Sequence, residues 1–459
     1  MSIRQRVLNA IAATAFGHLV TIVGQIALAP LFLSKWGVTA YGEWLMLSAI
    51  PAYLAVADVG IGSAAGNEMA MRAGSGDHEG AKRTFEGALL IAAAAFLFCA
   101  GVGSMAAFLT LEHGALNLSE LPRREAAGVL IVLSLYVGFS FVGNVTTNGF
   151  RSYERNALGL MTSNVGRFAE ILATGCALWI DAGPVTIASL MLATNIATAL
   201  LRFALLQRVC PRLFGLRFVA DLGLLRRLLR PALGFVAIPA GNAVLLQGSI
   251  LVIAQVLGGS AVALFSTTRT LTRLPVQLAN MLNASIWPEM STAYGAGNQG
   301  LLRRLHRASV AISLATSAAL VVGLSGFGPE IFRLWLNQTI DYDRGVSTSL
   351  LLAALVSAVW NTSSIVLAAT NRHLTFGMLF LGLGALCIAI SIPLMQRFGL
   401  IGMCYSLLAF ELALGAFVVS RALRVSGDSV REFVLAIAVA LPRRIDRVVR
   451  SWNFRGRNP

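Results

Sequence analysis

The chain has 459 residues, of which 56% are hydrophobic and only 12% are charged, and its mean hydropathy is +0.74. Soluble domains carry about 25% charged residues, so this composition excludes an ordinary soluble protein and predicts an all-α integral membrane protein. The formal net charge of +15 comes almost entirely from arginine. Because these arginines lie mostly in short loops between apolar segments, they do not indicate a nucleic-acid-binding patch.

Twelve apolar segments are long enough to cross a bilayer, which takes about 20 residues. In chain order they lie near 9–33, 41–63, 87–110, 128–150, 159–180, 184–206, 232–257, 261–287, 308–328, 346–369, 374–396 and 399–422. Most of the 36 Lys and Arg residues fall in loops on the side of the N-terminus. Since basic loops stay in the cytoplasm, both termini are predicted to be cytoplasmic.

The longest basic loop divides the chain into two sets of six segments. We therefore predict an N-terminal bundle over 1–207, a cytoplasmic linker over 208–230, a C-terminal bundle over 231–424 and a basic tail over 425–459. A shift of 221 residues, the separation of Gly37 from Gly258, aligns Gly76 with Gly297 and Arg83 with Arg304. Since that shift spans an even number of segments, the bundles are predicted to be related by a pseudo-two-fold axis along the membrane normal.

The eighth segment, 261–287, contains two arginines, Arg269 and Arg273. An arginine at the bilayer centre costs about 2.5–3.5 kcal/mol on insertion scales, so such a charge normally faces a cavity or an ionic partner. At helical spacing one face of about 120° carries these two arginines and four further polar residues: Ser266, Gln277, Asn280 and Asn283. This stripe predicts a cationic path for an anionic substrate; pairing of the arginines with Asp58 or Glu411 is the structural alternative.

Other segments also carry polar residues at helical spacing. The predicted lining set consists of Thr14, His18, Thr21 and Gln25; Tyr136, Ser140, Asn144 and Thr147; Asn164, Arg167 and Glu170; and Ser357 and Asn361. Interhelical hydrogen bonds between membrane helices explain such residues equally well. Arg167 is a candidate substrate ligand or a structural partner of Glu170 one turn away. His18, Glu170 and Asp58 are candidates for ion coupling, and Asp58 alternatively braces a turn.

No enzyme signature is present in the sequence. A Walker-type phosphate loop, HExxH, GxSxG and a Cys/His metal cluster are all missing, and the five cysteines show no CxxC spacing. We therefore expect no enzymatic activity, metal or cofactor. The run 433–441 is too short to span and is predicted to lie on the membrane surface or to form part of a disordered basic tail.

Three stretches resemble the polysaccharide-biosynthesis branch of the MOP exporter superfamily, the Wzx-like flippases. They run over 28–70, beginning LAPLFLSKWGVTAYGEW; over 265–305, beginning FSTTRTLTRLPVQLANM; and over 147–159, TNGFRSYERNALG. The resemblance implies a MATE-like fold of two six-helix bundles around a cationic cavity in the bacterial inner membrane. It implies alternating-access transfer of an undecaprenyl-pyrophosphate-linked sugar unit to the periplasmic leaflet, with Arg269, Arg273 and Arg167 facing its phosphates.

Two further families share this architecture. A MATE-type, cation-coupled multidrug antiporter is the alternative, although the first and seventh segments lack the acid that many such proteins carry there. Lipid II flippases of the MurJ type usually add two further spans. The implied partners are the lipid-linked glycan, the bilayer and other polysaccharide assembly proteins.

Overall fold

A computed structural model describes residues 3–55, 65–66, 68–69, 72–73, 75–114, 116–153, 155–214, 239–370 and 374–438. Over these ranges the regular secondary structure is entirely helical, with no strand. Nine of the helices described are long and apolar enough to cross a membrane. The chain forms two compact units, one of Met1–Leu264 with Trp335–Ile340 and the other of Phe265–Leu334 with Asp341–Pro459.

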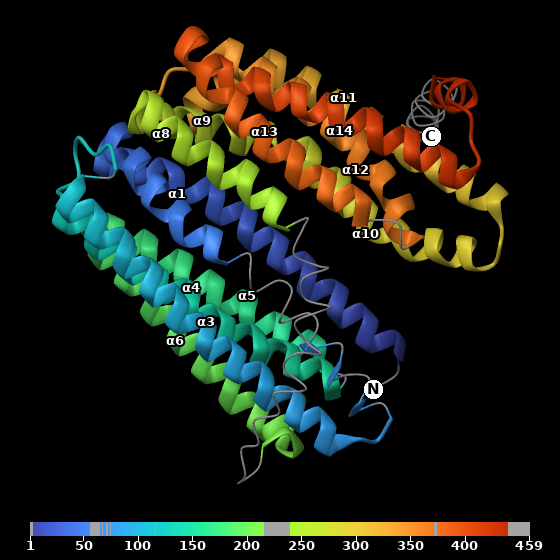
Figure 1. Cartoon of the computed structure of the whole chain (residues 1–459), viewed down its shortest axis with the longest axis horizontal. Helices are drawn as coiled ribbons and strands as arrows, with labels where there is room; N and C mark the ends of the chain where they lie inside the picture. The colour runs from blue at the N-terminus through green and yellow to red at the C-terminus, as the bar shows by residue number, and fades with distance from the viewer. Residues whose placement is uncertain are drawn as a thin grey trace, which may run out of the picture. The chain divides into compact units, whose positions relative to one another are not determined.

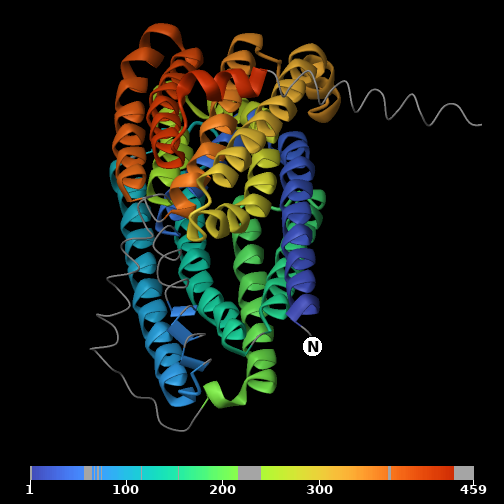
Figure 2. The same ribbon diagram turned by 90° about the vertical axis from the view of Figure 1, so that its right-hand side faces the viewer.

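The first unit is a bundle of long helices (Figure 1). In chain order they are α1 (Ile3–Leu54), α3 (His78–His113), α4 (Arg123–Gly149), η1 (Phe150–Tyr153), α5 (Asn156–Trp179), α6 (Pro184–Val209), η2 (Pro211–Leu213), η3 (Val244–Gly248) and α8 (Ser249–Leu257). Helix α4 packs against α3 and α6, and α5 packs against α1 and α6. Figure 2 shows α3 to α6 running side by side from a second direction.

The second unit repeats this all-helical plan. Its helices are α10 (Leu274–Gly295), α11 (Gln299–Trp335), α12 (Arg344–Ala369), α13 (Leu374–Phe398) and α14 (Leu400–Ser426). Helix α9 (Gly259–Thr272) begins in the first unit and ends in the second. Helix α14 packs against α12 and α13, and α12 also packs against α10.

Within the described residues every predicted segment falls on a helix, although 56–63 of the second segment and 232–238 of the seventh lie outside them. The first two segments follow each other in the run α1, which is kinked between them at Gly37, with φ 77° and ψ 178°. The eighth segment, predicted as one span, is divided into α9 and α10 by a turn at Arg273. Pro275 lies two residues beyond this turn and lacks the N–H that a continuous helix would use. The predicted linker 208–230 falls largely within 215–238, outside the described residues.

Local structure repeats at the offset that the sequence predicted. Helices α3 and α4 begin at 78 and 123, and α11 and α12 begin at 299 and 344. Gly37 and Gly258 share a left-handed φ (77° and 85°) and the same ψ of 178°, a conformation that glycine adopts without steric cost. The hydroxyls of Thr39 and Ser260, which are 221 residues apart, lie 2.9 Å from each other. Equivalent positions of the two repeats therefore meet directly.

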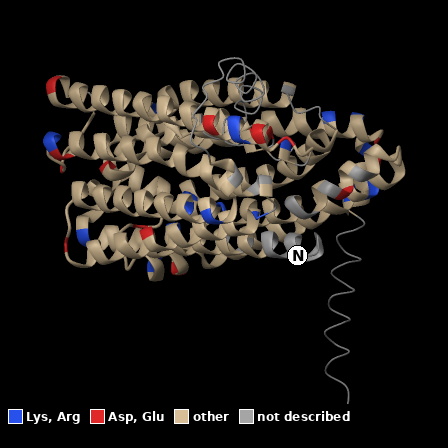
Figure 3. Ribbon diagram, turned by 90° about the horizontal axis from the view of Figure 1, so that it is seen from below, with Lys and Arg blue, Asp and Glu red and all other residues tan. Residues whose placement is uncertain are grey.

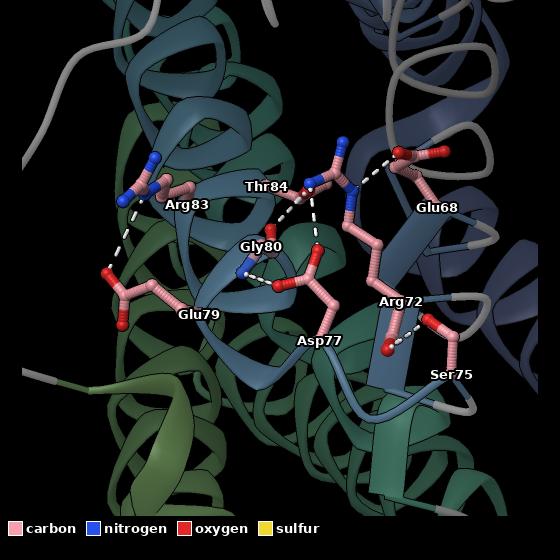
Figure 4. Close-up of polar contacts among 8 residues, drawn as sticks. All are labelled: Glu68, Arg72, Ser75, Asp77, Glu79, Gly80, Arg83 and Thr84. Atoms are coloured by element: carbon pink, nitrogen blue, oxygen red, sulfur yellow. Dashed lines mark hydrogen bonds and ion pairs between the residues drawn. The ribbon is translucent and has the colours of Figure 1, made fainter.

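The turn before α3 and the turn before α11 are built alike. Gly76 and Gly297 both have positive φ, and the side chains of Asp77 and Asn298 accept hydrogen bonds from the backbone N–H three residues on, at 2.8 and 2.9 Å. Such side-chain caps stabilise a helix by about 1 kcal/mol. As far as the side chains are described, an ionic bridge is found at the first turn alone, where Arg72 reaches Glu68 and Asp77 (Figure 4).

Charged residues are sparse along the ribbon, most of which is neither acidic nor basic (Figure 3). Large apolar side chains are instead exposed along the helix flanks, as at Leu97 (69%) and Val322 (72%), which suits a surface in contact with lipid. One buried carboxylate has a structural role: Glu43 accepts hydrogen bonds from the backbone N–H groups of Ser119, Glu120 and Leu121 ahead of α4.

The chain continues beyond α14 as a short helix over 430–438, which packs on the second unit. Phe433 is buried and stacks on His306, and Arg307 binds Asp428 and Glu432. The hydrogen bonds from Arg307 lower the pKa of Asp428. This contact is therefore complete above the ordinary aspartate pKa of about 4 and weakens as the pH falls below it. The basic residues from 439 onward lie outside the described residues.

Candidate functional site

Arg269 and Arg273 lie one helical turn apart at the junction of α9 and α10, and both are partly buried. The guanidinium of Arg269 lies over the ring of Phe265, 4.9 Å from its centroid, in a cation–π contact. The backbone N–H groups of Arg273 and Gln277 still donate to carbonyls four residues earlier, at 3.0 Å each. The turn thus keeps both arginines on one side of the chain while ending the regular helix between them.

The polar stripe around these arginines contains buried side-chain atoms that have no hydrogen-bond partner among the described residues. They are Ser266 Oγ, Gln277 Oε1 and both amide atoms of Asn283, a residue that is only 4% exposed. Asn280 differs, because its Oδ1 accepts a hydrogen bond of 2.8 Å from Asn361 on α12. Most buried polar atoms in proteins are paired, so a cluster of unpaired ones on one stripe indicates groups available to a ligand or to water.

Helix α14 carries a carboxylate in the second unit. The indole N–H of Trp360 on α12 donates to Glu411 Oε2 at 2.5 Å. Of the two acids considered as partners for the arginines, Glu411 lies in the same unit as Arg273, whereas Asp58 lies outside the described residues. Ser357 and Asn361, both predicted as lining residues, lie on α12 together with Trp360, and Asn361 bonds Asn280 of the stripe.

In the first unit the predicted polar residues form a different network. Arg167 is exposed on α5 and donates to Thr21 Oγ1 on α1 at 2.9 Å. The predicted partner of Arg167, Glu170, accepts its hydrogen bonds from Tyr136 on α4 instead, at 3.1 and 3.2 Å. Because the facing helix supplies a phenol donor, the i, i+3 pair predicted within α5 is replaced by two contacts between helices.

Arg202 was not predicted as a site residue, because it lies at the cytoplasmic edge of the predicted segment 184–206. It is only 6% exposed, and its guanidinium donates to the hydroxyls of Thr147 and Ser163 at 2.9 and 3.1 Å. Two hydroxyls on neighbouring helices thus hold a buried cation. The sequence signal that could have found it is a cation within a membrane-length apolar segment, as at Arg269.

The remaining predicted site residues are less informative. Asn144 is partly buried on α4, and its carbonyl accepts a hydrogen bond of 2.9 Å from Asn148. The side chain of His18 and the whole of Asp58 lie outside the described residues. Among the described residues no group of three or more His, Cys, Asp or Glu is arranged to hold a metal ion.

The contact between Trp360 and Glu411 was not predicted from the sequence. Glu411 is the only acid within α14, and an acid inside a membrane-length helix is by itself a signal of function or of a buried partner. Trp360 was not predicted, because a tryptophan in an apolar segment has no polar signature until its N–H is seen to need an acceptor.

No sequence-family model and no curated protein matches the chain. Solved structures do match it. An inward-facing multidrug resistance MATE family transporter of the MOP superfamily is 16% identical, with a TM-score of 0.72 over 91% of this chain and 98% of that one. Lipid II flippase MurJ in an inward closed conformation is 14% identical, with a TM-score of 0.69 over 94% of this chain and 90% of that one.

An outward-facing MATE family transporter of the MOP superfamily is also similar, at 17% identity and a TM-score of 0.64 over 92% of this chain and 96% of that one. These proteins are transporters and a flippase and not enzymes. At such low identity the likeness shows the fold alone. The chain has the all-α fold of the MATE transporters and MurJ, as predicted.

Proposed function

We propose that this protein moves an undecaprenyl-pyrophosphate-linked sugar unit from the cytoplasmic to the periplasmic leaflet of the bacterial inner membrane by alternating access. Surface polysaccharide assembly proteins would act before and after it. The observation that carries the proposal is the pair of arginines at the junction of α9 and α10, flanked by unpaired buried polar atoms. Arginine binds phosphate through two parallel N–H donors, so Arg269 and Arg273 suit a pyrophosphate.

The other stripe residues would complete the substrate site. Gln277 and Asn280 offer amide groups that hydrogen-bond sugar hydroxyls. Arg167 and Asn144 stay predicted substrate ligands on the first unit. The prenyl tail would stay in lipid, so the protein needs to shield only the polar head. The similarity to lipid II flippase MurJ, which has the same fold, supports a flippase.

A multidrug antiporter is the second candidate function. The MATE structures favour it, and so do two acids inside helices of the bundles, Glu170 beside Tyr136 and Glu411 beside Trp360. A carboxylate with an adjacent aromatic ring is a suitable site for an organic cation or for a coupling proton. If the protein is an antiporter, the two arginines would balance the charge of the acids and would not contact the substrate.

The test is complementation of a deletion strain with the wild-type gene and with Arg269→Ala, Arg273→Ala, Arg269→Lys and Arg273→Lys. Arg397→Ala is the matched control, because Arg397 makes a similar cation–π contact, with Phe398, at the end of α13. Surface polysaccharide, the lipid-linked intermediate in the cytoplasmic leaflet, drug resistance and protein level are measured in every strain.

The flippase proposal predicts lost polymer and accumulated intermediate in both Ala variants at normal protein level, partial recovery with Lys and no effect of Arg397→Ala. Normal polymer in both Ala variants would make the arginines structural. A deletion strain with unchanged polymer and raised drug sensitivity would favour the antiporter.

A further inference from the structure

The chain turns sharply at the end of α14 and begins a further helix over 430–438. Gly427 ends α14 in the left-handed conformation, with φ 66°, which turns the chain away from the helix axis. Ser429 caps the new helix, because its hydroxyl accepts the backbone N–H of Glu432 at 3.2 Å. Figure 2 shows this short helix, near the red end of the chain, running crosswise to α14. It therefore lies at the end of a membrane-length helix without continuing it.

One side of the short helix is docked on the second unit. Phe433 is only 4% exposed and stacks on His306 of α11, with 5.0 Å between the ring centroids. Ile437, one turn further on, packs against the same core cluster. Next to His306, Arg307 donates hydrogen bonds to two acids near the start of the helix: Asp428 and Glu432. The helix is thus held by an aromatic contact and by ion pairs.

The first unit shows that this docking belongs to the repeated fold. Phe214, which follows α6, packs edge-to-face on Phe85 of α3, with 5.5 Å between the ring centroids. Phe85 and His306 are separated by 221 residues, the offset of the repeat. After α6 and after α14, the chain therefore folds back with an aromatic ring onto the equivalent position of α3 or α11. The repeated fold accounts for the docked side of 430–438 but not for its exposed side.

The apolar face of the short helix is wider than the part that the second unit covers. At 100° per residue, four apolar side chains fall within an arc of about 100°: Phe433, Ile437, Val430 and Val434. Phe433 and Ile437 pack on the bundle, but Val430 and Val434 are 64% and 56% exposed. A helix at the end of a membrane-length helix, with one apolar edge on the protein and the other exposed, suits the boundary between lipid headgroups and acyl chains.

Positive charge accompanies this exposed edge. Three arginines at the end of α14 and on the short helix are exposed: Arg421, Arg424 and Arg431. In the part of the chain that the structure describes, none of the three forms an ion pair, whereas Arg307 is neutralised by Asp428 and Glu432. An acidic protein would match the charge alone. An acidic phospholipid offers phosphate to the arginines and acyl chains to the valines, so it matches both features.

We propose that the end of α14 and the helix 430–438 form a binding surface for acidic phospholipids of the bilayer. The two exposed valines contact acyl chains, and the three exposed arginines contact phosphate headgroups. Through Phe433 and Arg307, this surface also fixes the start of α11 at the level of the headgroups. The surface binds the surrounding lipid and is independent of the transported substrate.

The first experiment measures whether lipid covers the exposed edge, in the full-length protein reconstituted at one copy per nanodisc. An environment-sensitive fluorophore is attached to Val434→Cys in a Cys176→Ser background, because the other four cysteines are buried. Leu412→Cys is the reference for lipid, since Leu412 is 54% exposed on α14, and Gln299→Cys, at the exposed start of α11, is the reference for water. In discs of equal parts phosphatidylcholine and phosphatidylglycerol, acrylamide should quench the label at 434 as little as the label at 412.

The second experiment measures the contribution of charge, by varying the share of phosphatidylglycerol in the discs. Protection of the label at 434 should increase with that share. Each arginine near an acidic surface strengthens lipid binding about fivefold, so Arg431→Gln should need about fivefold more phosphatidylglycerol for half of the protection. Combining it with Arg421→Gln and Arg424→Gln should raise the requirement at least about tenfold. The matched control is Arg304→Gln, which removes an exposed arginine of α11 and should leave the protection unchanged.

Three results would overturn the proposal. If acrylamide quenches the label at 434 as strongly as the label at 299 in every lipid, the exposed edge faces water. If protection does not depend on phosphatidylglycerol, or falls as much with Arg304→Gln as with Arg431→Gln, the surface is not a site for acidic lipid. If protection in pure phosphatidylcholine disappears when 439–459 is removed, the chain's own tail covers the edge.

Discussion

The polar centres of the two units, on α4 to α6 and on α9 and α10, hold their polar groups in different ways. In the first unit, Glu170 is bonded by Tyr136, Arg167 by Thr21, and Arg202 by Thr147 and Ser163. In the second unit, the stripe on α9 and α10 retains unpaired buried atoms at Ser266, Gln277 and Asn283.

A polar group buried without a partner costs roughly 1–3 kcal/mol, so a protein keeps several of them on one stripe only where something else compensates. The contrast teaches that intramembrane charge alone does not mark a site. Paired charges hold helices together, whereas buried polar atoms without a partner indicate where a ligand or water binds. We therefore interpret the first centre as mainly structural and the second as the substrate site.

The largest expected effect comes from comparing arginines between the two centres. Arg273→Gln should reduce transport at least tenfold, because each charge-assisted hydrogen bond to a phosphate is worth about 1.5–3 kcal/mol. Arg167→Gln, which loses a bond to Thr21 at an exposed position, should reduce it less than about threefold. Export of polysaccharide in the complemented deletion strain measures both effects. Equal losses would show that the two centres do not differ in function.

Arg202 tests the structural interpretation of the first centre. Arg202→Ala should lower stability by about 3 kcal/mol, since it empties a packed position between α4 and α6 and removes the donor to Thr147 and Ser163. Arg202→Met keeps the volume and should recover most of the loss. Thermal melts in detergent measure stability, and transport per folded molecule should be unchanged in both variants; a transport defect in stable Arg202→Met would make this arginine functional.

A substitution in the second centre should raise the stability of the protein, whereas one in the first centre should lower it. Gln277→Leu removes an unpaired buried carbonyl and should raise stability by up to about 1 kcal/mol while it impairs transport. Tyr136→Phe deprives Glu170 of its donor and should cost about 1–2 kcal/mol while transport is retained. Melting temperatures and export are measured in parallel, and a destabilised Gln277→Leu would show that this amide is already satisfied.

The smallest expected effects concern the capped turns before α3 and α11, which should behave identically in the two units. Asp77→Ala and Asn298→Ala each remove a side chain that caps a helix, and each should cost about 1 kcal/mol. Arg72→Ala should add at most a few tenths to this, because its pairs with Glu68 and Asp77 are partly exposed (Figure 4). A clearly larger loss at Asp77 than at Asn298 in the melting temperature would show that the ionic bridge, and not the cap, fixes the first turn.

The sequence by itself determined the class of protein, the twelve apolar segments and the repeat with its offset. These features are local: hydropathy reports which segments prefer lipid, and glycines with capping residues define turns without help from distant parts of the chain. The turns at Gly76 and Gly297, with their capping residues, can therefore be recognised from the sequence alone.

Only the tertiary structure decided which polar groups meet. The bonds of Glu170 to Tyr136 and of Glu411 to Trp360, and the burial of Arg202, depend on the rotation and register of neighbouring helices. Helical periodicity places a residue on a face but does not say which helix that face contacts. Partner choice, and with it the difference between a structural charge and a site, is therefore a property of the packed bundle.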